Sequence, residues 1–481
     1  MNRKMVYYMT GRIILLEGAL LLVPLLVSLI YQDPGTVPFL ITIAICAAVG
    51  GALSCFFRKT SQVIFAKEGF LITALAWLSV SAIGAIPFVL SGQIPSYIDA
   101  FFETVSGFTT TGASILTHVE SMSHSLLFWR SFTHWMGGMG VLVLMVAIMP
   151  NLSSRTIHVL RAEMPGPTMG KLVPRLRDTA KILYVLYFVL TAAEFVLLLA
   201  GGMPVFDSAI HALGTAGTGG FGIKGDSIAS YSPYLQWVIA AFMMLFGVNF
   251  NLYYLLILRR FRSILRSEEL WTYVIVVLSA TGLIAWNILP LYQNLSEATR
   301  QAFFQVNTIT STTGFSTADF NQWPELSKTL LVLLMFMGGC AGSTAGGLKV
   351  SRLVMLYKIV KRELRHLLHP RSVGAVRFEG KTVDNTTLIS VANYFAIYAG
   401  LFVVFLLIVS FQPGFNLQSN FTAVASCFNN IGPGLDLVGP AANFAAYKPV
   451  LKLVLSFAML FGRLEIYPML ISMSPSTWLR K

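Results

Sequence analysis

Four short segments of this chain combine a glycine with small polar residues, a pattern that suits the binding of a cation by backbone carbonyls. Each follows a short stretch of helical character and lies between two strongly apolar stretches. They are Thr109-Thr110-Thr111-Gly112, Gly217-Thr218-Gly219-Gly220, Ser311-Thr312-Thr313-Gly314 and Asn429-Asn430-Ile431-Gly432. Backbone that leaves the helix inside a membrane must direct its carbonyls at something polar. Four such turns in one chain therefore predict a single ring of carbonyls around a dehydrated cation.

The residue types in these turns favour a monovalent cation. Glycine allows backbone dihedrals that a Cβ would strain, and a threonine before it offers a hydroxyl and a stiff side chain. Ringed carbonyls can replace the hydration shell of a large monovalent cation without formal negative charge. A divalent cation would call for acidic ligands, and no turn has one between its half-helix and its glycine. We therefore expect K⁺ or Na⁺ rather than Ca²⁺ or Mg²⁺.

The predicted ion-binding residues are the glycine of each turn and the two residues before it. They are Thr110, Thr111, Gly112, Thr218, Gly219, Gly220, Thr312, Thr313, Gly314, Asn430, Ile431 and Gly432. The fourth turn departs most from the threonine pattern and the second is intermediate. The predicted ring is therefore only approximately fourfold.

Fixed spacings relate the four turns to one another. Ala-Phe-Phe begins twelve residues before Gly112 and again twelve residues before Gly314, and an aspartate precedes Gly112 and Gly220 by thirteen residues. Each unit therefore reads as a span, a half-helix, a glycine turn and a second span. Each half-helix should direct the negative end of its dipole at the turn, where it favours a cation. The four predicted N-caps are Asp99, Asp207, Ser296 and Ser419.

Composition places these units in a membrane protein that crosses the bilayer many times. Of 481 residues, 55% are hydrophobic and only 11% are charged, and the mean hydropathy is +0.70. These values exclude an ordinary soluble protein. Apolar runs long enough to span a bilayer are predicted at residues 13–30, 38–56, 70–90, 124–149, 180–200, 235–258, 270–291, 327–369, 388–411 and 449–472. The first is a retained span rather than a signal peptide, because it is too long and carries Glu17.

Topology explains the net charge of +13 better than a nucleic-acid partner does. Lysine and arginine gather at both termini and in alternate connecting segments, as expected of loops on the cytoplasmic side. We therefore expect a multi-pass plasma-membrane protein with both termini in the cytoplasm. A basic inner face would also suit membrane lipids with anionic headgroups or an acidic cytoplasmic partner.

Ten consecutive small residues, 338–347, interrupt the run 327–369 and make a poor helix. Unwound backbone at membrane depth is acceptable only where it is buried in protein or lines water. We therefore predict a flexible intramembrane loop beneath the turns that acts as a gate. Its named residues are Gly338, Gly339, Gly342, Ser343, Thr344, Gly346 and Gly347. A close helix–helix packing face of the Gly-x-x-x-Gly kind is the alternative.

One arginine lies within the last predicted span, where a charge is costly unless it meets a partner or a water-filled path. We expect Arg463 to face the pathway, to repel cations and to anchor the loop through its carbonyls. A structural ion pair with a neighbouring helix is the alternative. Glu465, two residues on, points to another face of the helix. Arg130, with His134 one turn below, is assigned a packing or interfacial role.

The predicted fold is an all-α polytopic membrane protein. Four non-identical span–pore helix–span repeats surround one pseudo-fourfold pore, preceded by a two-span leader. The leader covers residues 1–66, and the repeats cover 67–152, 178–262, 268–369 (with the loop 338–347) and 384–481.

The four turns, the repeats and the leader together resemble the TrkH family, the membrane subunits of bacterial Trk potassium-uptake systems. That family belongs to a superfamily shared with KtrB and the plant HKT proteins. The resemblance covers essentially the whole chain, and the leader favours TrkH over the shorter KtrB. It implies that Gly112, Gly220, Gly314 and Gly432 line a selectivity filter, and that the small-residue loop and an arginine of the last span control the pathway. Glycine at position 112, where Na⁺-transporting HKT relatives tend to have serine, implies K⁺.

The resemblance also implies partners. The family usually forms a homodimer and binds a cytosolic nucleotide-binding subunit of the TrkA type, for which the basic segments 155–181 and 349–381 are plausible docking surfaces. No cofactor is expected in this chain, with K⁺ as the transported ion, and no nucleic-acid partner. The expected location is the bacterial inner membrane.

Other functions stay open at this point. A Na⁺-permeable transporter or a Na⁺- or H⁺-coupled symporter of the same superfamily would share the four turns. A secondary transporter of a small organic solute predicts two inverted repeats, whereas this chain has four parallel ones. An enzyme would need convergent His, Asp, Glu or Cys residues in the spans, and we find no such group in the sequence. We therefore do not expect an enzyme.

Overall fold

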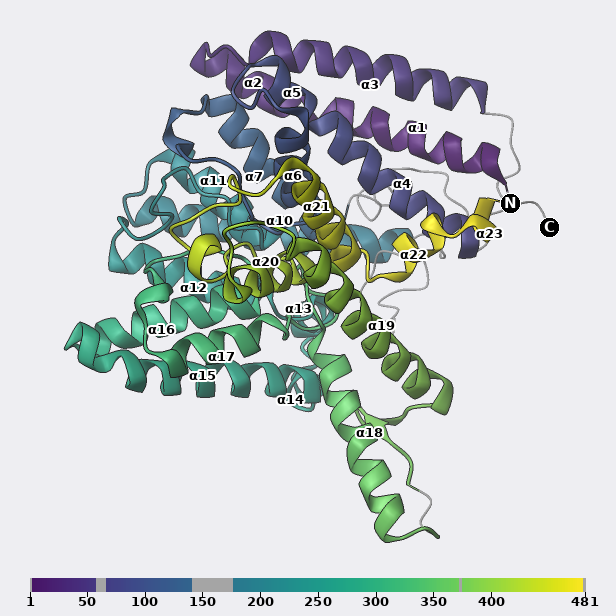
Figure 1. Ribbon diagram of the computed structural model, residues 1–481, viewed down its shortest axis with the longest axis vertical. Helices are drawn as coiled ribbons and strands as arrows, with labels where there is room; N and C mark the ends of the chain where they lie inside the picture. Colours follow the sequence, from purple (N-terminus) through teal and green to yellow (C-terminus); the bar gives the residue numbers. More distant parts are fainter. Residues whose placement is uncertain (1, 58–65, 141–175, 372–373, 479–481) are drawn as a thin grey trace.

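The computed structural model describes residues 2–57, 66–140, 176–371 and 374–478 (Figure 1). Within these residues the chain is predominantly α-helical. The β-structure there is one antiparallel hairpin of β1 (Arg377–Phe378) and β2 (Lys381–Thr382). The all-α polytopic class predicted from the sequence is therefore confirmed.

The leader consists of α1 (Arg3–Leu20), α2 (Leu22–Tyr31) and α3 (Thr36–Phe56). Helices α1 and α3 lie side by side at the top of Figure 1. Glycines permit this close approach, because a Cβ on Gly50 would lie 2.8 Å from the carbonyl oxygen of Gly11. After α2, Asp33 accepts hydrogen bonds of 2.8 Å from the backbone N–H and the hydroxyl of Ser125, which ties the leader to the first unit.

The same order of elements recurs four times after the leader: a long helix, a short helix that ends at a glycine turn, and a second helix. The first unit contains α4 (Ala66–Gly84), α5 (Ile86–Leu90), α6 (Tyr97–Phe108) and α7 (His124–Gly138). The second contains α10 (Leu176–Ala200), α11 (Val205–Gly217), α12 (Pro233–Phe246), α13 (Phe250–Ile257) and α14 (Phe261–Leu265). The third contains α15 (Glu268–Tyr292), α16 (Leu295–Thr310), α17 (Glu325–Met335) and α18 (Val350–Leu368). The fourth contains α19 (Asn385–Val409), α20 (Leu417–Asn429), α21 (Pro449–Arg463), α22 (Tyr467–Met473) and α23 (Pro475–Trp478). Single 3₁₀ turns follow three of the glycine turns: η1 (Val119–Ser121), η3 (Phe320–Gln322) and η4 (Asp436–Val438).

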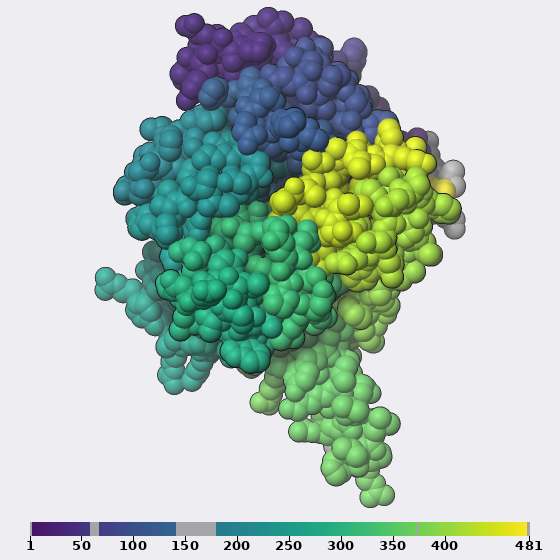
Figure 2. All heavy atoms as spheres, turned by 60° about the vertical axis from the view of Figure 1, so that its left-hand side comes forward, coloured from purple at the N-terminus to yellow at the C-terminus, as the bar shows by residue number. Residues whose placement is uncertain are grey.

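The four units follow one another around a common centre, coloured blue, teal, green and yellow in Figure 2. The second helix of each unit packs against the short helix of the next: α7 on α11, α12 on α16, α17 on α20 and α21 on α6. The last of these contacts closes the circle. It is reinforced by an ion pair of 2.6 Å between Lys452 on α21 and Asp99 on α6.

The second helix of each unit is broken or ends early. In the described part of the chain, the helices long and apolar enough to cross a membrane are Arg3–Tyr31, Thr36–Phe56, Lys67–Leu90, Thr179–Ala200, Glu268–Tyr292 and Asn385–Val409. Helices α12 and α13 reach this length only as a pair bent by 91°. Helices α7, α17 and α21 end early, and the predicted residues 141–149 lie outside the described part. The predicted spans 124–149, 235–258 and 449–472 are therefore not single continuous helices, whereas the break after α17 agrees with the interruption predicted for the run 327–369.

Glycines next to two of these breaks allow the second helices to lie against the ends of the short helices. A Cβ on Gly137 would clash with the carbonyl oxygen of Phe108, and one on Gly462 would clash with that of Phe428. Each of these carbonyls lies at or near the end of a short helix. The second helices are thus shaped to approach the short helices closely rather than to continue across the membrane.

The predicted N-caps of the short helices are wrong by two or three residues. Ser96, Asn294 and Asn416 are the caps of α6, α16 and α20, and their side chains accept from the N–H groups of Asp99, Ser296 and Ser419. Helix α11 begins after Pro204, with Asp207 in its first turn. An N-cap side chain must reach the N–H two or three residues ahead. The fixed distance to the glycine therefore identified the first turn of each helix instead of its cap.

Replacement of Gly50 by alanine is expected to destabilise the contact of α1 with α3. The new Cβ would lie within 3.0 Å of three atoms of α1, and overpacking of this kind costs about 1–3 kcal/mol. Gly51→Ala is the matched control, because no atom lies within 4 Å of its Cβ position. Thermal unfolding of the purified variants in detergent measures the difference, and equal midpoints would contradict the packing argument.

Candidate cation site

Each short helix ends in the same backbone motif. The residue two before each glycine has a positive φ: 55° at Thr110 and Thr218, and 57° at Thr312 and Asn430. The residue after it donates its N–H to the carbonyl five residues back, at 2.8–2.9 Å in all four turns. This is the hydrogen bond of a Schellman motif, which ends a helix and turns the chain away from its axis.

The conformation at these positions is strained for threonine. A β-branched residue with positive φ is a genuine outlier, and such backbone costs about 1–3 kcal/mol. Asparagine tolerates the left-handed region better. Asn430 therefore fits the shared geometry more easily than the three threonines do. The fourth turn, which departs most in sequence, keeps the same backbone as the others.

The four turns form a closed ring of close backbone contacts. A Cβ on Gly112 would clash with the carbonyl oxygen of Gly219, one on Gly220 with that of Thr313, and one on Gly314 with that of Ile431. A Cβ on Gly432 would lie 2.8 Å from the carbonyl oxygen of Thr111, which returns to the first turn. The carbonyl before each glycine thus lies against the glycine of the preceding unit. These contacts join eight of the twelve predicted ion-binding residues, and the other four, Thr110, Thr218, Thr312 and Asn430, are the positive-φ residues that come directly before them.

Two cavities border this region. One is lined by all four glycines of the ring together with residues that follow them, among them Ser114, Gly222, Ser316 and Pro433. The other is lined by the segment Gly342–Gly347, by Gly138 at the end of α7, and by Arg463. One cavity thus borders the ring itself, and the other borders the small-residue segment and Arg463.

The segment 338–347 is not helical, so it is not a helix–helix packing face of the Gly-x-x-x-Gly kind. Its ends are joined, because Gly338 donates to the carbonyl of Leu348 at 2.8 Å and Val350 donates to that of Gly339 at 3.2 Å. Its tip lies against the ring: Gly346 donates to the hydroxyl of Thr312 at 2.7 Å. The predicted unwound loop is present beneath the turns, and its role as a gate stays a prediction.

Arg463 meets backbone carbonyls. It donates to Thr344 of the loop at 2.8 Å, and to Gly137 and Gly138 at the end of α7 at 2.6 and 2.7 Å. The anchoring of the loop through its carbonyls was predicted, whereas the contact with α7 was not. Glu465 pairs instead with Arg352 at 2.5 Å.

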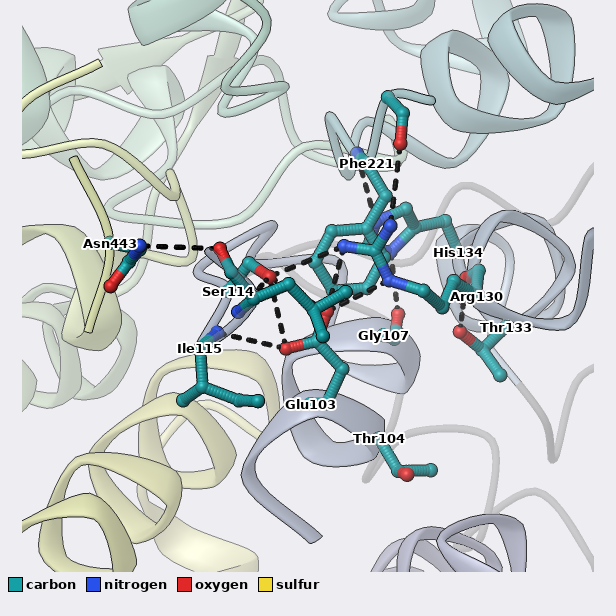
Figure 3. A network of polar contacts seen from close by, with 12 residues as sticks. Glu103, Thr104, Gly107, Ser114, Ile115, Arg130, Thr133, His134, Phe221 and Asn443 are labelled. Atoms are coloured by element: carbon teal, nitrogen blue, oxygen red, sulfur yellow. Dashed lines mark hydrogen bonds and ion pairs between the residues drawn. The ribbon is translucent and has the colours of Figure 1, made fainter. Parts of the chain in front are cut away.

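A buried polar network supports the ring from the side of the first two units (Figure 3). Arg130, 2% exposed, forms an ion pair of 2.7 Å with Glu103 on α6. Glu103 also accepts from the hydroxyl of Ser114 and the N–H of Ile115, just after the first turn. The guanidinium lies 4.1 Å above the ring of Phe221, just after the second turn. Sequence reasoning missed Glu103, although an acid in the interior of a predicted half-helix, beyond its first turn, is a usable signal.

His134 belongs to the same network. Its Nδ1 lies 2.7 Å from the carbonyl oxygen of Gly107, and its Nε2 accepts from the N–H of Phe221 at 3.3 Å. One ring nitrogen must therefore be a donor and the other an acceptor, which requires a neutral imidazole with the proton on Nδ1. The predicted packing role of Arg130 agrees with these contacts, which join α6 to the second turn, whereas no role was predicted for His134 from the sequence.

Among the described residues no three His, Cys, Asp or Glu side chains gather in a group that could hold a metal ion. The polar groups that converge at the ring are backbone carbonyls. Such oxygens suit a weakly hydrated monovalent cation.

Comparisons with known proteins point to one family. A family model described as "TrkH: Cation transport protein" matches residues 36–480. The chain is similar to the Trk system potassium uptake protein TrkH of Salmonella typhimurium, with 37% identity over 99% of this chain and 100% of that protein. It is similar to TrkG of Escherichia coli, with 34% identity over 99% of this chain and 98% of the relative. The crystal structure of the potassium transporter TrkH from Vibrio parahaemolyticus covers 100% of both chains, with a TM-score of 0.89 and 32% identity.

Removal of the acid from the buried network is expected to destabilise the protein. Glu103→Ala leaves the charge of Arg130 buried without its carboxylate, which typically costs about 3–5 kcal/mol. The double variant Glu103→Leu/Arg130→Met removes both charges and should recover part of the loss. Thermal unfolding in detergent distinguishes the three proteins, and a single variant as stable as the wild type would contradict the role given to the pair.

Proposed function

Because the chain belongs to the TrkH family of cation transport proteins, we propose that it takes up K⁺ through one pore whose selectivity filter is the ring of four glycine turns. The chain is a multi-pass inner-membrane protein of the Trk potassium-uptake family and not an enzyme. In this proposal the four units are the pore repeats 67–152, 178–262, 268–369 and 384–481, behind a leader of residues 1–66. The ion crosses between them at the level of the glycines.

The observation that carries the proposal is the closed cycle of glycine-to-carbonyl contacts. Each short helix ends at the ring, so the negative ends of four helix dipoles converge on it. The carbonyl oxygens supply partial negative charge without a carboxylate, which suits a monovalent ion. Glycine at position 112, together with the family, supports K⁺ over Na⁺.

We further propose that the loop 338–347 and Arg463 gate this pore. The loop lies against the ring through Gly346 and Thr312, in the path that an ion leaving the ring would take. Arg463 adds a positive charge to the same cavity, where it would repel a cation. Its hydrogen bond to Thr344 holds the loop in the closed position. Flux would then require the loop to move aside.

For partners we propose a homodimer and a cytosolic nucleotide-binding subunit of the TrkA type. Helix α18 projects from the body of the protein, at the bottom of Figure 1, and supports the predicted docking surface 349–381. It carries Lys358, Lys361, Arg362 and Arg365, a charge pattern suited to an acidic partner. The other predicted surface, 155–181, lies almost entirely outside the described residues. Coupling of flux to H⁺ or Na⁺ is not part of this proposal.

Gly220→Ala is expected to reduce K⁺ uptake at least tenfold. Its Cβ would clash with the carbonyl oxygen of Thr313, and φ is +76° there; strain of this kind costs about 1–3 kcal/mol. Gly202→Ala is the matched control, because φ is +83° but no atom lies within 4 Å. Rb⁺ influx into proteoliposomes, with Na⁺ in a parallel assay, measures both variants. An equal loss of Rb⁺ influx in the two variants would mean that the positive φ alone causes the effect. That result would contradict the role of the Gly220 contact in the ring.

Arg463→Ala is expected to raise the Rb⁺ leak of proteoliposomes about tenfold, because the loop loses a charged donor worth about 1.5–3 kcal/mol. Arg463→Lys keeps the charge but cannot bridge all three carbonyls, so an intermediate leak is expected. Loss of folded protein without increased leak would favour the structural alternative.

A further inference from the structure

A single carboxylate binds the small-residue loop and the start of the helix that follows it. Glu269 lies in the first turn of α15 and is 5% exposed. Its Oε1 accepts from the N–H of Ala341, inside the loop, at 2.7 Å, and from the N–H of Ser351, just beyond the loop, at 3.0 Å. The segment between these two N–H groups includes Ser343–Gly347, the part of the loop that lines the inner cavity.

The position of this carboxylate follows from the chemistry of helix ends. Ser351 lies in the first turn of α18, where backbone N–H groups have no partner within the helix. A negative charge is favoured at this end by the helix dipole. The loop N–H of Ala341 shares the same oxygen, so α15, α18 and the loop are joined at one atom. The two bonds fix the chain on both sides of Gly346, which contacts the ring, and so restrict movement of this segment away from the ring.

The backbone of Glu269 is itself held from the β1–β2 hairpin. Glu379 accepts from the hydroxyl of Ser267 at 3.0 Å and from the N–H of Glu269 at 3.1 Å. Glu379 has a φ of 51° and Gly380 one of 73°, so they form a two-residue turn with both φ positive. Asparagine, aspartate or glycine is preferred at the first position of such a turn. A glutamate is strained there, and its carboxylate is used to cap α15.

We propose that Glu269 is the positioning residue that keeps the loop closed under the ring. This inference rests on the proposed gating role of the loop. Loss of the carboxylate releases Ala341 and Ser351 together, whereas the ring and Arg463 stay intact. The loop then leaves the ring more often, and the pathway opens without an activating partner.

Native thiols report the position of the loop separately from ion flux. Cys340 lies in the loop and is fully buried, as are Cys46 in α3 and Cys427 in α20. A small thiol reagent added to the purified full chain, followed by mass spectrometry of the peptides, gives a modification rate for each cysteine. Release of the loop raises the rate at Cys340 alone, whereas general unfolding raises all three.

The variants are Glu269→Ala, Glu269→Gln and the matched control Glu268→Ala. Glu268 occupies the same helix end and pairs with Lys358, away from the loop. We expect Glu269→Ala to raise both the Cys340 rate and the Rb⁺ leak about tenfold, since hydrogen bonds to a charged group are lost. Glu269→Gln keeps an acceptor oxygen and should stay within about threefold of the wild type. Glu268→Ala should change neither rate.

Two results would overturn the inference: a wild-type Cys340 rate in Glu269→Ala, or equal increases at Cys46, Cys340 and Cys427. A raised Cys340 rate with unchanged Rb⁺ flux would instead support Glu269 as the residue that holds the loop and refute the gating role of the loop. The failure of the inference and the failure of the proposed function are thus separate outcomes.

Discussion

The close approach of four glycines to four carbonyl oxygens is the constraint on which the rest of the structure depends. No Cβ fits at Gly112, Gly220 or Gly314, so the four turns can meet only if each backbone follows the same path. That path begins with the left-handed residue that ends each short helix. It also requires the helices behind the turns to be held rigidly, which the ion pair of Arg130 with Glu103 and the neutral His134 achieve between the first two units. The closed ring therefore comes with strained backbone at three threonines and with a buried ion pair between Arg130 and Glu103.

Below the ring, backbone polar groups at the helix breaks also need hydrogen-bond partners. The second helix of each unit ends early, which leaves carbonyls without partners inside the apolar region. Arg463 satisfies carbonyls of α7 and of the loop, and the loop N–H groups bind Thr312 and Glu269. Broken helices, a basic side chain and a buried carboxylate thus form one hydrogen-bonded layer. This layer gives the proposed gate a defined closed state and a small number of bonds to break.

The four glycine turns have the same backbone conformation, but their side chains make different contacts with the loop. Thr218 donates to the carbonyl of Thr344 and Thr312 accepts from Gly346, while the hydroxyl of Thr110 has no hydrogen-bond partner among the described residues. The loop therefore lies under the second and third turns more than under the first. Family membership supplies the class of transported ion, and the proposed gate would act on a nearly fourfold ring through unequal contacts with its turns.

The sequence by itself determined the membrane class, the four glycine turns, the unwound segment 338–347 and the exceptional position of Arg463. These are local properties: composition, fixed spacing, poor helix propensity and a charge in an apolar run. Which residues meet across the chain was decided only by the tertiary structure. The early ends of α7 and α21, the ion pair of Arg130 with Glu103 and the contacts of Glu269 depend on neighbours far away in the sequence. The N-caps are local, but the spacing to the glycine does not say which polar residue of the first turn is the cap. Hydropathy cannot separate a broken helix from a continuous one, because a break inside a membrane is stable only when another part of the chain satisfies its backbone.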